Sequence, residues 1–247
     1  MANWTIDINC DVGEGVGNET EIFPYISSCN IACGGHAGDI ETMTQIVKLA
    51  NQHIVKIGAH PSYPDRVNFG RQVIDISKQE LQRSITEQLK NFDAILVNEQ
   101  GELHHIKAHG ALYNQSAKDK SLAKTYLEAV QEYKTRALLY VPYGSEIARE
   151  ALDQGFEIWY EAFGDRNYNR DLSLVNRKQG NALIQDPEQV LQHMLPIIKE
   201  GKVRAVSGEL VKIEAKTLCI HGDTPSALEI LMYLSHELSK HQVQLLQ

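Results

Sequence analysis

Four short apolar runs of the chain each end in a histidine at a turn marked by glycine or proline. The histidines are His36, His60, His109 and His221, and a fifth apolar run opens into carboxylates at Asp11. One histidine after one strand is more often a buried structural residue, but five polar strand ends suggest a shared site. Because ligand and catalytic groups gather at the carboxyl ends of parallel strands in α/β proteins, we expect an enzyme whose active site lies at this rim.

The first apolar run supplies three candidate catalytic carboxylates, which are Asp7, Asp11 and Glu14. Strand alternation places Asp7 and Asn9 on one face of this run. Asp7 then needs a partner inside the protein, because burying a lone carboxylate is costly. Asp11 and Glu14 follow in a glycine-containing turn, where they could take part in proton transfer. The alternative is a structural Asp7 paired with a lysine, followed by a solvated turn.

Lys107 and His109 lie two residues apart and therefore share a strand face. A lysine that points into a barrel can hold an anionic oxygen, or can react at a lowered pKa if it is desolvated. His109 can transfer protons near neutral pH. The alternative is a core ion pair between Lys107 and Asp7, and we expect a structural role for the neighbouring His104 and His105.

The last apolar run supplies two more candidate catalytic residues, His221 and Asp223, and leads into a helix opened by Thr224 and a proline. The free N–H groups and positive end of a helix N-terminus attract a carboxylate or a phosphate. Asp223 could instead be a simple capping residue. Arg66 and Arg71 follow His60 in a loop that could equally be only a lid. The candidate substrate-binding residues are Asn30, His36, Arg66, Arg71, Glu161, Asp165 and Arg166.

The elements that must position these residues alternate between strand-like and helix-like along the whole chain. The expected strands are Trp4–Asn9, Ser27–Cys33, Ile54–His60, Leu103–His109, Ala137–Pro142, Glu157–Phe163 and Thr217–His221. The expected helices are Glu41–Gln52, Lys78–Gln100, Ser121–Lys134, Gly144–Gln154, Pro187–Lys199 and Pro225–Leu246. This alternation predicts a parallel sheet, and polar groups at five strand ends favour its closure into a barrel. We therefore expect a single-domain α/β protein over residues 1–247, with a short extra hairpin (Arg204–Val206 and Leu210–Ile213) before the last strand.

Composition excludes several classes of function. The net charge of −8 disfavours nucleic acid as a partner. We expect a cytoplasmic protein without membrane contact, because the N-terminus has no signal pattern and no apolar run reaches the ~20 residues of a spanning helix. The four cysteines have no zinc-binding spacing and are expected to be buried thiols. The H-E-x-x-H, Walker A, G-x-S-x-G and G-x-G-x-x-G patterns are absent from the sequence.

Together these motifs resemble the LamB/YcsF family, in one order from the first strand to the last helix. The segments that carry the resemblance are 7–14, 30–39, 58–65, 69–71, 107–113, 161–166 and 221–223. The resemblance implies a (β/α) barrel of the glycoside hydrolase/deacetylase type, often seven-stranded. It also implies hydrolysis of 5-oxo-L-proline to L-glutamate with ATP and magnesium, carried out together with two partner subunits, B and C.

The implied reaction suits the residues found above. Opening a stable lactam needs a cation for the developing anion, proton-transfer groups and a grip on the substrate carboxylate. Lys107 suits the first role; Asp7, Asp11 or Glu14 with His60 or His109 suit the second; Arg66 or Arg71 suits the third. Two alternatives stay open: a divalent-metal-dependent deacetylase-like hydrolase, and a non-catalytic subunit that presents the substrate. The sequence leaves open which subunit binds ATP and whether a metal ion is bound to the protein.

Overall fold

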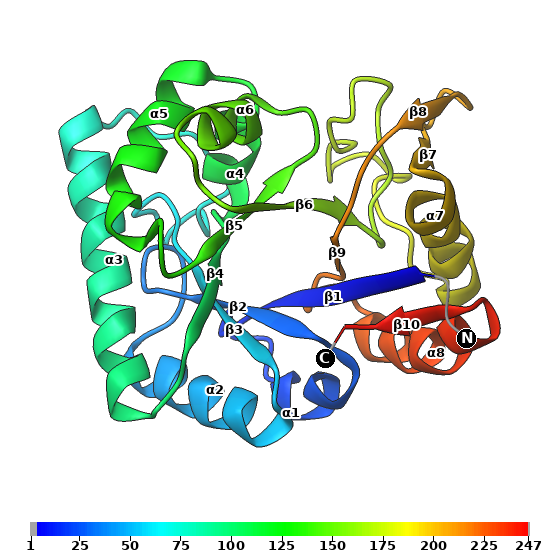
Figure 1. The fold of residues 1–247 in the computed structure, drawn as a ribbon, viewed down its shortest axis with the longest axis horizontal. Coiled ribbons are helices and arrows are strands. Elements are labelled where there is room, and N and C mark those ends of the chain that lie inside the picture. The colour runs from blue at the N-terminus through cyan, green and yellow to red at the C-terminus, as the bar shows by residue number, and fades with distance from the viewer. Residues whose placement is uncertain (1–3, 247) are drawn as a thin grey trace.

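The computed structural model describes residues 4–246, and its central sheet is a closed parallel barrel (Figure 1). The ring closes because β1 pairs with β2 on one side and with β9 on the other. Its seven strands, in ring order, are β1 (Trp4–Val12), β2 (Ser28–Ala32), β3 (Lys56–His60), β4 (Leu103–Ile106), β5 (Leu138–Pro142), β6 (Ile158–Phe163) and β9 (Thr217–Cys219). The predicted seven-stranded (β/α) barrel is confirmed.

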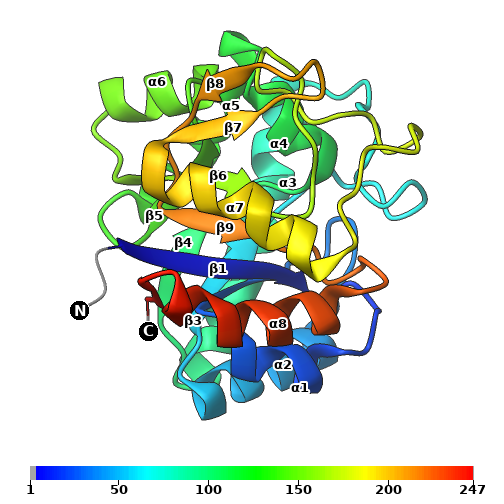
Figure 2. The ribbon, with the colours of Figure 1, turned by 90° about the vertical axis from the view of Figure 1, so that its right-hand side faces the viewer.

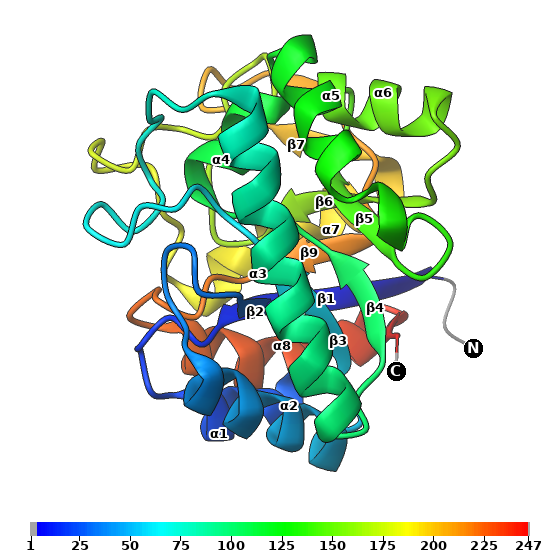
Figure 3. The ribbon, with the colours of Figure 1, turned by 90° about the vertical axis from the view of Figure 1, so that its left-hand side faces the viewer.

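Helices cover the outside of the barrel. Figure 2 shows α7 and α8 side by side next to β1, and Figure 3 shows α3 crossing the opposite side, between α2 and α5. The main helices are α2 (Ile40–His53), α3 (Lys78–Asn98), α5 (Lys120–Ala129), α6 (Glu146–Asp153), α7 (Pro187–Glu200) and α8 (Ala227–Lys240). Side chains at Asp39, Ser77, Ser145 and Asp186 accept N–H groups of the first helical turn, which explains where these four helices begin.

Two expected boundaries are wrong. The last helix ends at Lys240 rather than Leu246, because Gln242 adopts a left-handed conformation with φ of 62°. Residues 243–245 then form β10 (Val243–Leu245), which pairs in parallel with the start of β1. The expected helix Ser121–Lys134 ends at Ala129 instead and is followed by the 3₁₀ turn Gln131–Tyr133. The short helices α1 (Glu19–Ile22) and α4 (Gly110–Ser116) and the 3₁₀ turn Phe23–Tyr25 were not expected. The predicted hairpin is present as β7 (Lys202–Arg204) and β8 (Leu210–Lys212).

The barrel has an apolar outside and a polar inside. On β1, Ile6 and Ile8 belong to the apolar core, whereas Asp7 and Asn9 bond polar side chains of neighbouring strands. This contrast follows from strand alternation, and it allows the strands to carry buried polar groups toward one end of the barrel. The four cysteines are buried free thiols, as expected. Among the described residues, no helix is both long and apolar enough to cross a membrane.

Candidate active site at the carboxyl end of the barrel

Lys107, directly after β4, points into the barrel interior and binds two carboxylates. Its Nζ lies 2.9 Å from Oδ1 of Asp11 and 2.8 Å from Oε1 of Glu161. Burial alone would lower the pKa of Lys107, but Asp11, the Cys219 thiol and Glu161 outweigh it and hold the pKa well above its usual value. Lys107 is therefore a fixed cation, and the expected alternative of a lysine with a lowered pKa is wrong.

Asp11, near the end of β1, is held as a carboxylate anion. Burial would raise the pKa of Asp11, but the neighbouring His60 and Lys107 outweigh it and lower the pKa well below its usual value. Asn30 on β2 donates to Oδ1 of Asp11 at 2.8 Å and to Oδ1 of Asn9 at the same distance. Both hydrogen bonds of the Asn30 amide nitrogen are therefore made within the protein, where they orient the Asp11 carboxylate, and not to a substrate.

Asp7 belongs to a lower layer of the barrel interior. Its Oδ2 accepts hydrogen bonds from Ser28 at 2.7 Å and from Thr217 at 2.6 Å. Burial raises the pKa of Asp7 despite these bonds. The alternative of a core ion pair between Asp7 and Lys107 is wrong, because Asp11 and Glu161 take that place.

His105 and His104 also lie below the rim. His105 is fully buried, with Nε2 2.7 Å from Oδ1 of Asn30 and its ring stacked on Tyr140 at 3.8 Å between centroids. Nδ1 of His104 lies 3.1 Å from Nδ1 of His105. These contacts agree with the structural role expected for both residues.

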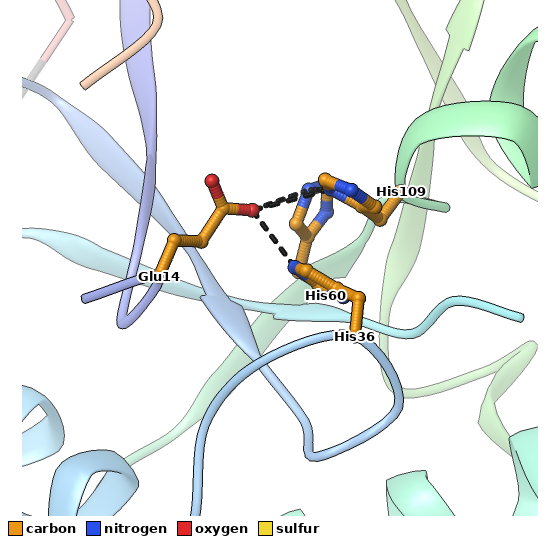
Figure 4. Close-up of side chains that lie close together, drawn as sticks. All are labelled: Glu14, His36, His60 and His109. Atoms are coloured by element: carbon orange, nitrogen blue, oxygen red, sulfur yellow. Dashed lines mark hydrogen bonds and ion pairs between the residues drawn. The ribbon is translucent and has the colours of Figure 1, made fainter. Parts of the chain in front are cut away.

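Three of the four turn histidines meet at Glu14 (Figure 4). Oε1 of Glu14 lies 2.8 Å from Nε2 of His36, 3.2 Å from Nδ1 of His109 and 3.9 Å from Nε2 of His60. Burial lowers the pKa of His36 to about 4 and also lowers that of His109. Burial would raise the pKa of Glu14, but its contacts with His109 and His36 outweigh it and lower the pKa. The sequence motifs thus converge on a cluster of three imidazoles around a carboxylate, which we call the histidine cluster.

The fourth turn histidine, His221 after β9, is oriented by Asp165. Nδ1 of His221 lies 2.9 Å from Oδ1 of Asp165, and its backbone N–H donates to Oδ2 at 3.0 Å. Thr224 also donates to Asp165, at 2.7 Å, and the ring of Phe163 stacks on His221. Because a carboxylate only accepts hydrogen bonds, Nδ1 of a neutral His221 carries the proton and Nε2 is its basic nitrogen. His221 and Asp11 also lie within 4.8 Å of each other at their nearest ligand atoms.

Arginines from two loops meet at Asp223. Oδ2 of Asp223 lies 2.6 Å from Nη2 of Arg71 and 3.1 Å from Nη1 of Arg177. Asp223 does not cap the last helix, whose N-cap is Ser226, so the capping alternative is wrong. Arg177 was missed by the sequence analysis, because it lies in a loop without strand or helix periodicity.

The other two candidate arginines bond backbone carbonyls. Arg66 donates to the backbone carbonyls of Gly34 and Gly38. Arg166 is buried and donates to the carbonyls of Val175 and Ala182, which fixes the loop after β6. Of the three predicted arginines, Arg71 bonds the side chain of another candidate residue, Asp223, whereas Arg66 and Arg166 bond backbone carbonyls.

The protein is a closed (β/α) barrel, and proteins with this fold place their reactive groups at the carboxyl end of the strands. Here that end holds a buried cation, an aspartate-oriented histidine and the histidine cluster. The sequence pattern of the LamB/YcsF family matches residues 6–247, and the chain belongs to that family.

Similar proteins extend over almost the whole chain. A Pyrococcus furiosus protein, named as the A subunit of 5-oxoprolinase, is 37% identical over 246 residues, covering 98% of this chain and 96% of that protein. A protein of the same name from Shouchella clausii is 44% identical over 243 residues, covering 96% of each. The crystal structure of the lactam utilization protein from Thermus thermophilus superposes with a TM-score of 0.91 at 36% identity, over 98% of both chains. A family 4 carbohydrate esterase from Streptomyces lividans shares the fold alone, with a TM-score of 0.50 at 9% identity over 100% of this chain and 94% of the esterase.

Proposed function

We propose that this chain is the A subunit of an ATP-dependent 5-oxoprolinase, which hydrolyses 5-oxo-L-proline to L-glutamate together with subunits B and C. The observation that carries the proposal is the almost full-length likeness, at 37% and 44% identity, to two proteins that bear this subunit's name. The name of the Thermus thermophilus relative refers to the same bond type, since a lactam is a cyclic amide.

The proposed reaction explains the need for ATP. A five-membered lactam is a poor electrophile, so its carbonyl oxygen is activated first, by transfer of the terminal phosphoryl group of magnesium-bound ATP. Water then adds to the imidate carbon, and breaking the C–N bond frees the amine and leaves an acyl phosphate. A second water hydrolyses the acyl phosphate to the new carboxylate and inorganic phosphate. The protein must therefore stabilise negative charge on oxygen, remove a proton from water and donate one to nitrogen.

Lys107 and His221 are suited to these roles. The fixed positive charge of Lys107 faces the barrel interior beside Asp11 and can stabilise an oxygen anion. His221 can accept the water proton at Nε2, because Asp165 holds its Nδ1 proton and stabilises the imidazolium that forms. The same imidazolium can then return the proton to the leaving nitrogen.

Arg71 is the candidate for holding the substrate carboxylate, and Arg177 adds a second guanidinium. Both now share a single carboxylate, Asp223, whose oxygen they contact at 2.6 and 3.1 Å. A guanidinium fork matches a carboxylate in shape and charge. A substrate carboxylate could therefore compete with Asp223 for these donors and be fixed near His221.

A second candidate function is a divalent-metal-dependent hydrolase of the deacetylase type. The histidine cluster favours it, because three imidazoles and one carboxylate are also a typical ligand set for a catalytic metal ion. The two functions differ in their co-substrate: the oxoprolinase consumes ATP, and the hydrolase does not.

Reconstitution tests the proposal. The purified chain, subunits B and C, 5-oxo-L-proline and magnesium–ATP are mixed, and glutamate and ADP are measured together. We expect equal amounts of both products from the full mixture and negligible glutamate from the chain alone. Robust ATP-coupled activity of the isolated chain would contradict the need for three subunits, and no glutamate from the full mixture would contradict the function. Unchanged turnover with His221→Gln and Lys107→Met chains would instead identify a subunit that only presents the substrate.

A further inference from the structure

The neutral histidine cluster has too few N–H hydrogens to make a hydrogen bond along each of its short contacts. Nδ1 of His60 lies 2.8 Å from the carbonyl oxygen of Lys107, and Nε2 of His109 lies 3.0 Å from the carbonyl oxygen of Phe69. Because a carbonyl only accepts hydrogen bonds, each of these ring nitrogens carries a hydrogen. The opposite nitrogens, Nε2 of His60 and Nδ1 of His109, are then lone pairs when the rings are neutral.

These two lone pairs face each other and a carboxylate. Nε2 of His60 lies 3.0 Å from Nδ1 of His109, and Oε1 of Glu14 lies 3.2 Å from the same Nδ1. A single added proton can form a hydrogen bond along only one of these two contacts. A cation at the centre would accept all the lone pairs at once.

We propose that this cluster binds one divalent transition-metal ion, of the zinc type, through Glu14, His36, His60 and His109. One potential ligand atom of each residue lies within 4.8 Å of those of the other three. The atoms that face one another are Oε1 of Glu14, Nε2 of His36, Nε2 of His60 and Nδ1 of His109. This assignment depends on side-chain geometry and not on the identity of the substrate.

The spacing of the ligand atoms fits such an ion. Bonds of about 2.0–2.1 Å in a tetrahedral zinc site place neighbouring ligand atoms ~3.4 Å apart. Four of the separations in the cluster are 2.8, 3.0, 3.2 and 3.9 Å, which bracket that value. Small side-chain movements would equalise them.

The surroundings of His60 and His109 also fit. Histidines that bind metals usually donate their second N–H to a carbonyl or carboxylate, as His60 and His109 do here. His36 is oriented by stacking on His109, with 3.6 Å between ring centroids and 5° between ring planes. All three histidines are buried, so the cluster is shielded from solvent. When bound, the ion would supply positive charge beside Asp11, whose Oδ2 lies 3.5 Å from Nε2 of His60.

Metal content and affinity test the proposal without an activity assay. The chain is purified without a histidine tag, analysed by elemental mass spectrometry, stripped with a chelator and titrated with Zn²⁺ and Co²⁺ by calorimetry. We expect about one ion per chain, a rise in Tm on Zn²⁺ addition, and a Co²⁺ spectrum typical of nitrogen and oxygen ligands. Failure of the folded chain to bind Zn²⁺ or Co²⁺ would overturn the proposal and leave a protonated cluster.

Variants locate the site. We expect His60→Gln and His109→Gln to weaken Zn²⁺ binding ~100-fold or more, and His236→Gln, which replaces an exposed histidine, to leave it unchanged. Glu14→Gln is the conservative variant if a histidine variant does not fold, because the amide keeps the shape and removes the charge. Affinity unchanged in Glu14→Gln and in the folded histidine variants would place any bound ion elsewhere and overturn the assignment. Loss of metal binding with oxoprolinase turnover intact would leave the proposed function standing, so the two hypotheses fail separately.

Discussion

Asp7 and Asp11 lie four residues apart on the inward face of β1, yet they belong to different hydrogen-bond layers of the barrel. Asp11 contacts Lys107 at 2.9 Å, whereas Asp7 is bonded to the hydroxyls of Ser28 and Thr217. The sequence makes both residues catalytic candidates, because alternation tells which face a residue occupies but not its depth. The contacts separate them into one carboxylate at the rim and one below it.

The first prediction compares Asp11→Asn with Asp7→Asn in the reconstituted complex. Asp11→Asn removes the negative charge that orders Lys107 and faces His60, and we expect kcat to fall at least ~100-fold, or about 2.7 kcal/mol on the barrier. Asp7→Asn keeps an acceptor for the hydroxyls, and we expect kcat within ~3-fold of wild type with a loss of about 1–2 kcal/mol in unfolding free energy. Steady-state kinetics and urea unfolding measure the two effects. A large loss of kcat in Asp7→Asn would return that residue to the catalytic set.

The second prediction concerns Lys107→Met. Removing the ammonium leaves Asp11 and Glu161 without their cation, and we expect turnover to be abolished. The same change should lower the unfolding free energy by about 3–5 kcal/mol, because a buried carboxylate loses its partner. The double variant Lys107→Met with Glu161→Gln relieves part of that cost, and we expect it to be more stable but equally inactive.

Stability and turnover must therefore be measured on the same preparations. Lys48→Met, which removes a surface lysine from an exposed ion pair with Glu99, is the control and should be neutral in both. Turnover of a folded Lys107→Met variant within about twofold of wild type, only ~0.4 kcal/mol on the barrier, would make Lys107 structural.

The fold was largely predictable because its signals are local. Strand alternation, helix periodicity and capping residues such as Ser77 define each element within a few residues of sequence. The end of α8 was predicted wrongly, because pairing of Val243–Leu245 with β1 is a contact between the two ends of the chain. Local sequence carries no signal for such a pairing.

The residues of the candidate site were predictable from the sequence, but the contacts between their side chains were not. Motifs at strand ends point to His36, His60 and His109, since parallel strands must bring their carboxyl ends together. Which arginine reaches the rim depends instead on loop conformation. Arg66 turns to backbone carbonyls and Arg177 reaches Asp223, and neither follows from sequence spacing.

The third prediction concerns Arg71→Gln and Arg177→Gln. If these guanidinium groups hold the substrate carboxylate, each loss removes a charge-assisted hydrogen bond of about 1.5–3 kcal/mol, which corresponds to a ~10–100-fold rise in KM. We expect kcat to stay within ~3-fold, because the contact is the same in the ground and transition states. Arg136→Gln, on the outer surface beside Asp93, is the matched control.

A substrate without the carboxylate separates binding from other effects. The ring compound 2-pyrrolidinone has the same lactam, so its kcat/KM should be equal in wild type, Arg71→Gln and Arg177→Gln. An equal loss for both substrates would show that the arginines act on loop structure instead. Asp223→Asn should change KM for 5-oxo-L-proline with little change in kcat, whereas a hundredfold fall in kcat at unchanged stability would make Asp223 catalytic.

The last prediction concerns stability against pH, through a histidine outside the site. Burial lowers the pKa of His193 to about 4, although its hydrogen bond to the carbonyl of Phe163 acts in the opposite direction. An unfolded histidine has a pKa of about 6.5. Between these values the unfolded chain binds a proton that the folded chain does not, so the free energy of unfolding must fall as the pH is lowered from about 6.5 to about 4. Each such histidine contributes a slope approaching 1.4 kcal/mol per pH unit to the free energy of unfolding.

His193→Gln tests this, because it keeps an N–H donor for Phe163 and removes the titrating group. Urea unfolding between pH 4 and 8 should show a shallower fall of the unfolding free energy in the variant. The difference at pH 8, where wild-type His193 is neutral in both states, measures the structural cost of the substitution. Parallel curves for the two proteins would contradict the lowered pKa.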